Sequence, residues 1–125
     1  MICSQQRIVW KGAKVVVTVD CGTSAHDALA AASRMGLDVI VLDHHTVGPD
    51  LPRCFALVNP NRLDDQSNQG ALAAVGVTYL FLVALNRALR RTGYYQDISE
   101  PDLMSCLDLV ALGTVCDMVP LRGLN

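Results

Sequence analysis

Three candidate metal ligands, Asp43, His44 and His45, follow one another directly after the apolar segment 37–42. Carboxylate oxygens suit hard cations such as Mg²⁺, and imidazole nitrogens move the preference towards transition metals such as Mn²⁺. Two such cations about 3.5–4 Å apart can hold a phosphoryl group and supply hydroxide for in-line attack. The tripeptide therefore predicts metal-dependent hydrolysis of a phosphoester.

Two further acids, Asp20 and Asp117, fit the same ligand set. Asp20 directly follows a run of β-branched residues that is typical of a strand. Asp117 stands among apolar residues, where a buried carboxylate without a partner would be costly, so we expect a partner or a cation there. Together, the five residues predict a metal site built from carboxylates and imidazoles.

Each of these residues also has an ordinary structural interpretation. His44 and His45 could cap the end of a strand or bond to the backbone, and Asp20 could serve as a turn residue. His26, in the first turn of an expected helix, is predicted to face solvent. The histidine pair alone therefore leaves metal binding and a structural role open.

Five cysteines are scattered along the chain without a Cys-x-x-Cys pair, which favours reduced thiols over a disulfide framework. Cys21 stands beside Asp20, and Cys116 stands beside Asp117. A zinc site made by these cysteines with the two histidines stays an alternative, although structural zinc sites usually show closely spaced ligand pairs. The remaining cysteines are Cys3, Cys54 and Cys106.

The elements that must position these ligands form a βαβ unit over residues 14–42. Segments 14–20 and 37–42 read as strands, and Ser24 with Asp27 has the spacing of a capping box for the helix between them. Met35 and Gly36 are expected to end that helix. Strands joined by a right-handed crossover are parallel, so Asp20 and Asp43 should emerge at the same sheet edge.

The rest of the chain is expected to be mainly helical after a short third strand at 55–58. A long helix is predicted over 71–91, with close packing at Gly76 to compensate for the glycine. A final helix should begin at 99–102 with a second capping box and end near Gly113. We therefore predict one α/β domain over 1–125, with a parallel-sheet βαβ core at about 14–58 and a helical part at about 71–121.

Composition limits the function classes. The hydrophobic content of 51% is enough for one compact globular unit, and the net charge of −2 argues against a dominant polyanion-binding surface. Residues 1–7 lack the plan of a signal peptide, and the longest apolar stretch, 71–85, is short for a membrane span. A cytoplasmic protein without a membrane segment is expected.

Several motifs, in their order along the chain, resemble the DHH phosphoesterase superfamily and, within it, the RecJ-type branch of single-stranded-DNA-specific exonucleases. The resemblance covers about 14–121 and rests on Val19-Asp20-Cys21-Gly22, Asp43-His44-His45, Asn59-Pro60-Asn61, Ala74-Val75-Gly76-Val77 and the block 109–121. It implies a parallel α/β fold. It also implies Mn²⁺- or Mg²⁺-dependent 5′→3′ removal of nucleotides from single-stranded DNA, in repair and recombination.

The same resemblance implies a role for each candidate residue. Asp20 matches an aspartate that bridges two metals, His44 and His45 match histidine ligands, and Asp117 matches a further aspartate ligand. Asp43 resembles the acid of the same motif that orients an imidazole. Asp20, His44, His45 and Asp117 are thus the expected metal ligands, and the segment around Gly76 is expected to pack helices.

The family's aspartate-rich first motif has no counterpart before Lys14, since residues 1–13 contain no acid. Its C-terminal domains, which hold the DNA strand, are also without a counterpart. We therefore expect an internal piece of a RecJ-like nuclease that reaches single-stranded DNA through a longer parent and is weak or inactive alone. Two alternatives remain: a non-catalytic α/β module that self-associates, and a DHH phosphoesterase for short oligonucleotides or pyrophosphate.

Overall fold

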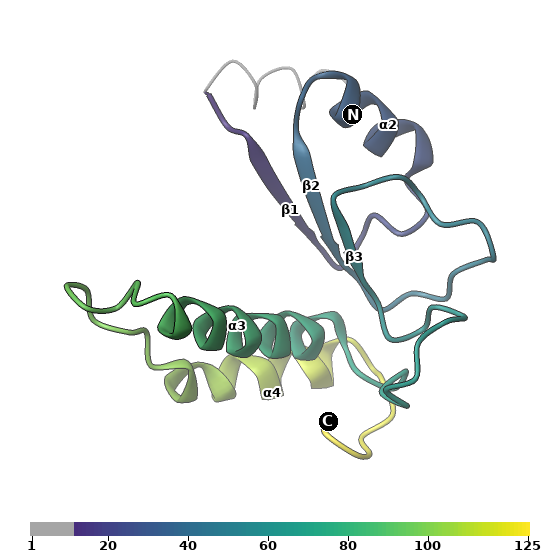
Figure 1. Cartoon of the computed structure of the whole chain (residues 1–125). Helices are drawn as coiled ribbons and strands as arrows, with labels where there is room; N and C mark the ends of the chain where they lie inside the picture. Colours follow the sequence, from purple (N-terminus) through teal and green to yellow (C-terminus); the bar gives the residue numbers. More distant parts are fainter. Residues whose placement is uncertain (1–11) are drawn as a thin grey trace. The chain divides into compact units, whose positions relative to one another are not determined.

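The computed structural model describes residues 12–125, and their contacts group into two compact units. The first unit ends at Gly70 and the second begins at Ala71 (Figure 1). This division separates the predicted βαβ core from the predicted helical part. The grouping of 1–125 into one DHH domain stays a prediction.

The first unit is a three-stranded parallel sheet in the order β1-β2-β3 with one helix packed on it. It contains β1 (Val15–Val19), α2 (His26–Arg34), β2 (Asp38–Leu42) and β3 (Ala56–Val58). Val19 pairs with Leu42, and Leu42 pairs with Val58, so all three strands end at the same edge. The predicted α/β class and parallel pairing are confirmed.

Helix α2 covers one face of the sheet because its apolar residues recur at helical spacing. The buried core that it forms with β2 consists of Leu29, Ala32, Leu37, Val39 and Val41. On β1, alternate side chains point to opposite faces, and those of Val15, Val17 and Val19 are 45–55% exposed. The first unit therefore leaves an apolar strip along β1.

The two ends of α2 differ in how well the sequence predicts them. The residue that precedes the helix is Ala25, and no side chain caps it, so the predicted capping box of Ser24 and Asp27 is wrong. At the other end, Met35 is the C-cap residue and Gly36 adopts φ +74°. The predicted glycine stop is confirmed, since that left-handed conformation favours glycine.

The second unit is a pair of packed helices, α3 (Ala74–Arg91) and α4 (Leu107–Cys116), with the short 3₁₀ helix η1 (Leu103–Cys106) before α4 (Figure 1). The capping box predicted at 99–102 is wrong. Asp102 caps η1 by accepting a hydrogen bond from the Met104 amide (3.0 Å), and Glu100 instead bonds to Arg90. The last helix also continues past Gly113, its predicted end, to Cys116.

Glycine permits close packing at two places in the second unit. A Cβ atom at Gly76 would lie 3.0 Å from Leu72 Cδ2, which accords with the close packing expected there. A Cβ atom at Gly113 would lie 2.9 Å from Val75 Cγ1 on the neighbouring helix. Gly113 therefore serves helix packing instead of ending α4.

The substitution Gly113→Ala is expected to lower the free energy of unfolding by about 1 kcal/mol, because overpacking of the added methyl group against Val75 outweighs the better helix propensity of alanine. Urea denaturation followed by circular dichroism measures this change. Gly48→Ala is the matched control, since a Cβ atom there has no neighbour within 4 Å. A Gly113→Ala variant more stable than the wild type, as helix propensity alone predicts, would show that α3 and α4 do not approach closely at Gly113.

Two further sequence expectations concern membranes and cysteines. Among residues 12–125, no helix combines the length and the apolar character needed to cross a membrane. Within the same range the cysteines are free thiols, namely Cys21, Cys54, Cys106 and Cys116. Cys3 and the segment 1–7 lie outside the described residues.

Candidate metal centre

The carboxyl ends of the three strands bring the predicted ligands of the first unit together. The Asp20 amide donates to the Leu42 carbonyl (2.9 Å), and the Asp43 amide donates to the Val58 carbonyl (3.0 Å). These bonds extend the sheet by one residue beyond β1 and β2. Asp20 and Asp43 therefore emerge at the same edge, as the sequence predicts, and the histidines follow directly.

Asp20 leaves the strand in a left-handed conformation, with φ +62°. Such a conformation is uncommon outside glycine, and aspartate and asparagine adopt it more readily than most residues. The Asp20 side chain is 58% exposed, and its Oδ1 lies 3.2 Å from His44 Nε2. The backbone turn thus aims an accessible carboxylate at a histidine ring from the neighbouring strand.

Among the described residues, Asp20, His44 and His45 form a cluster that could hold a metal ion. Each offers one ligand atom, and these atoms lie within 4.8 Å of one another. The two imidazole rings meet edge to face, with centroids 4.7 Å apart and planes at 62°. His44 is largely buried and His45 is exposed. One carboxylate with two imidazoles at this spacing fits a single divalent transition-metal ion.

Asp43 is buried, and both of its oxygens are occupied by hydrogen bonds. Its Oδ2 accepts from the Thr23 amide (3.0 Å) and the Thr23 hydroxyl (2.5 Å). Its Oδ1 accepts from the amides of His44 (2.8 Å) and His45 (3.3 Å), and lies 2.7 Å from His45 Nδ1. Asp43 therefore bonds to both histidines of the cluster but is not one of its three residues.

Two opposing effects act on the pKa of Asp43. Burial raises the pKa, whereas hydrogen bonds from the side chains of Thr23 and His45 and from the amides of Thr23 and His44 lower it. The hydrogen bonds dominate and hold the pKa well below its usual range. The carboxyl is thus ionised, so it accepts from His45 Nδ1–H, and Nε2 is then the nitrogen of that ring that carries the lone pair.

Asp117 belongs to the second unit, where it follows the last residue of α4. Its amide donates to the Gly113 carbonyl (3.0 Å), and its side chain is exposed. The partner or cation expected for Asp117 was required only if its carboxylate were buried, and the carboxylate is exposed. Its role as a metal ligand stays a prediction.

The other candidates of the sequence lie outside the cluster. Neither Cys21 nor Cys116 is among the ligand atoms that the described residues bring together, although both are exposed. His26 is exposed at the start of α2, as predicted. Within the first unit, Cys21 thus does not join the histidines in a cluster of ligand atoms, and Cys116 belongs to the second unit.

Three polar residues around the cluster were not predicted to act there: Thr23, Asn59 and Asn61. Thr23 and Asn59 are buried, and both bond to the segment that carries the histidines. The sequence signal was present, because Asn59-Pro60-Asn61 directly follows a strand. Polar residues at that edge of a parallel sheet are candidates for supporting the ligands.

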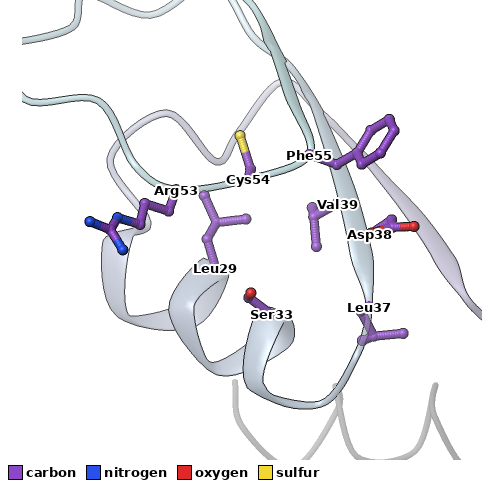
Figure 2. A pocket seen from close by; sticks show the side chains of 8 residues that line it. All are labelled: Leu29, Ser33, Leu37, Asp38, Val39, Arg53, Cys54 and Phe55. Atoms are coloured by element: carbon purple, nitrogen blue, oxygen red, sulfur yellow. The ribbon is translucent and has the colours of Figure 1, made fainter.

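A cavity of about 200 Å³ lies at the opposite, amino-terminal end of β2, between α2 and residues 53–55 (Figure 2). Leu29, Leu37 and Val39 line it with apolar atoms. Figure 2 shows the Arg53 guanidinium and the Phe55 ring pointing away from each other. The cavity is thus lined by none of Asp20, His44 and His45.

Comparison with protein families and relatives gives a consistent result. Residues 2–114 match the family described as "DHH family, N-terminal domain". The chain is 46% identical to the single-stranded-DNA-specific exonuclease RecJ of Dickeya dadantii (strain 3937), and 44% identical to that of Escherichia coli (strain K12). Each match covers 92% of this chain and 20% of the relative. The chain thus spans about a fifth of the length of these relatives.

Two solved structures resemble this fold. A crystal structure of exonuclease RecJ bound to manganese matches with a TM-score of 0.70 and 32% identity, over 94% of this chain and 28% of that one. RecJ from Thermus thermophilus in complex with Mn²⁺ matches with a TM-score of 0.68 and 33% identity, over 97% of this chain and 17% of that one. Both are manganese complexes.

Proposed function

Because the chain belongs to the DHH family, we propose that Asp20, His44 and His45 hold a divalent metal ion in a centre that hydrolyses phosphodiester bonds of single-stranded DNA. The observation that carries this proposal is the cluster of one carboxylate and two imidazoles at the carboxyl ends of the parallel strands. Two similar solved structures contain manganese, which supports a metal-dependent function for this chain.

The donor set favours Mn²⁺ over Mg²⁺ in this proposal. Mg²⁺ prefers oxygen ligands in octahedral geometry, whereas Mn²⁺ accepts imidazole nitrogen together with carboxylate oxygen. When bound, the metal polarises a phosphoryl oxygen and lowers the pKa of a bound water. The protein's own part is to hold an exposed carboxylate and two oriented rings around one position.

Asp43 acts in this proposal as a positioning residue. Its Oδ1 accepts from His45 Nδ1, so Nε2 is the nitrogen with which that ring would bind the metal. Asp117 is proposed as a further ligand. A second cation needs more carboxylates than the cluster contains, so a two-metal mechanism depends on Asp117 and on additional acids. With this small ligand set we propose weak or absent activity for the chain alone.

The proposed substrate is single-stranded DNA, attacked from its 5′ end in the cytoplasm, and the longer parent provides most of the binding surface. The relatives are named as exonucleases specific for single-stranded DNA. The net charge of −2 gives this chain little electrostatic attraction for DNA. This accords with the proposal that other parts of the longer parent make most of the DNA contacts. Roles in repair and recombination belong to the same proposal.

The test has two measurements. Mn²⁺ binding to the purified chain, followed by the electron paramagnetic resonance signal of free Mn²⁺, is expected to be saturable and reversed by EDTA. Digestion of 5′-labelled single-stranded DNA with Mn²⁺ is expected to be slow or undetectable. If the chain binds no Mn²⁺, the proposed metal site is wrong. If it digests the DNA rapidly and processively, the proposed weak activity of the chain alone is wrong. Cleavage of only short oligonucleotides or pyrophosphate supports the alternative phosphoesterase.

A second candidate function is self-association without catalysis. The exposed strip of Val15, Val17 and Val19 along β1 favours it, since such an edge strand pairs readily with another chain. Light scattering decides between the two functions: a monomer at high concentration contradicts self-association and leaves the metal site as the proposed function.

A further inference from the structure

We infer that Asn59 and Asn61 are positioning residues that hold the two histidines in ligand geometry by binding their backbone carbonyls. This inference rests on the proposed metal site and extends it to residues that touch no metal. It concerns the segment after β3, which contributes no atom to the cluster of Asp20, His44 and His45.

Asn59 is 3% exposed and uses both ends of its side-chain amide. Its Nδ2 donates to the His45 carbonyl (2.9 Å) and to the Thr23 hydroxyl (3.1 Å). Its Oδ1 accepts from the Asn61 amide (2.8 Å). These hydrogen bonds fix the orientation of the buried amide group. If it were reversed, its NH₂ group would face the Asn61 amide N–H, and its oxygen would face the His45 carbonyl.

Asn61 performs the same task for the other histidine. Its Nδ2 donates to the His44 carbonyl (2.5 Å) and to the Gly70 carbonyl (3.2 Å). A Cβ atom at Gly70 would lie 2.5 Å from Asn61 Oδ1, so glycine lets the polar segment 62–70 pack directly on this side chain. The two asparagines therefore bind the carbonyls of two successive residues.

Two successive carbonyls need such donors because of the geometry of the histidine pair. Neighbouring side chains of an extended strand point to opposite faces, so both rings can reach one metal only if the backbone bends after β2. A bent backbone leaves the regular ladder, and buried carbonyls then require other donors. The asparagine side chains supply these donors and fix the bend.

The ring of His45 is connected to the same network. Asn59 bonds to Thr23, the Thr23 hydroxyl donates to Asp43 Oδ2 (2.5 Å), and Asp43 Oδ1 accepts from His45 Nδ1 (2.7 Å). Asn59 thus fixes His45 at its carbonyl directly and at its ring through two other residues. Disturbing Asn59 should therefore alter the orientation and the tautomer of His45.

The substitutions Asn61→Asp and Asn59→Asp keep the shape of the side chain but turn an oxygen towards a histidine carbonyl. We expect Mn²⁺ affinity to fall by about 10–100-fold in each variant, the range seen when groups that orient metal ligands are lost. The added negative charge would by itself strengthen cation binding, so weaker binding points to lost geometry.

Asn68→Asp is the matched control, because it makes the same charge change at an exposed residue of the segment 62–70. Its backbone φ of +57° is tolerated by aspartate. Mn²⁺ affinity is measured at a temperature where circular dichroism shows each variant folded. Asn61 is only half-buried, so Asn61→Asp remains informative if Asn59→Asp unfolds.

A second measurement needs no metal. Long-range ¹H–¹⁵N spectra distinguish the two imidazole tautomers and report which nitrogen of His45 carries the proton. We expect the Nδ1–H tautomer in the wild type and mixed tautomers in Asn59→Asp. Unchanged Mn²⁺ affinity in both asparagine variants, or an unchanged His45 tautomer, overturns the inference. A wild type that binds no Mn²⁺ overturns the proposed function, and the tautomer then decides the inference.

Discussion

Replacing Asp20 by asparagine is expected to weaken Mn²⁺ binding by about 100-fold or more, with little change in stability. Asp20 supplies the carboxylate of the cluster that is proposed to hold the metal with His44 and His45. Loss of groups that only orient ligands already costs about 10–100-fold in affinity, so loss of a charged ligand should cost at least as much. Any hydrolysis that depends on this site should fall in proportion.

Stability should be preserved because asparagine fits the conformation of residue 20. Its backbone adopts φ +62°, a region in which asparagine is as well tolerated as aspartate. The side chain is 58% exposed, so the amide that replaces the carboxylate is solvated. The substitution thus removes a charge and a ligand without creating a cavity or a buried unpaired group.

The measurement is a Mn²⁺ titration of the wild type and the variant, with thermal unfolding followed in parallel. Asp50→Asn is the control, since it removes the same charge from an exposed loop outside the cluster. Equal affinity of Asp20→Asn and Asp50→Asn for Mn²⁺ would show that Asp20 is not a ligand. A reduced affinity in both variants would instead indicate a general effect of net charge.

The sequence was sufficient to predict the sheet and the position of the ligands. The β-branched run before Asp20 and the apolar run before Asp43 have the composition of buried parallel strands, and only a right-handed helical crossover joins such strands. Their carboxyl ends must then meet. That topological constraint places Asp20 near His44, although 24 residues separate them.

The helix ends were predicted less well because local spacing does not decide them. Ser24 and Asp27 have capping-box spacing, yet the helix begins at His26 and no side chain caps it. Thr23, directly before Ser24, is instead held by Asp43. Gly113 looked like a helix stop, but its missing side chain admits Val75 of another helix. In both places a tertiary contact determines the local structure.

The support of the site could not be predicted from spacing. Asn59 lies 14 residues after His45 and 36 after Thr23, and it bonds to both. Such bonds depend on how the three strands are aligned at their ends, which no local pattern encodes. The sequence shows which residues could be ligands, and the fold determines which of them are held in place.

Replacing Asp43 by asparagine is expected to lower both stability and metal affinity. The carboxylate accepts five hydrogen bonds from Thr23, His44 and His45, and it donates none. An amide group must direct its NH₂ either at Thr23 or at the histidine segment, where donors already point. A buried donor without an acceptor costs about 1–3 kcal/mol, so we expect about 3 kcal/mol less stability.

Metal affinity should fall by about 10–100-fold at the same time, because the ring of His45 loses the carboxylate that fixes its Nδ1–H tautomer. Urea denaturation and Mn²⁺ titration of Asp43→Asn measure the two effects, and Asp20→Asn provides the contrast. The two aspartates differ in burial and in hydrogen-bond partners, so the two substitutions should have different effects on stability. Asp20→Asn should alter affinity alone, whereas Asp43→Asn should alter both quantities. If Asp43→Asn kept full stability and lost only affinity, the carboxylate would be acting as a ligand instead of as the support beneath the histidines.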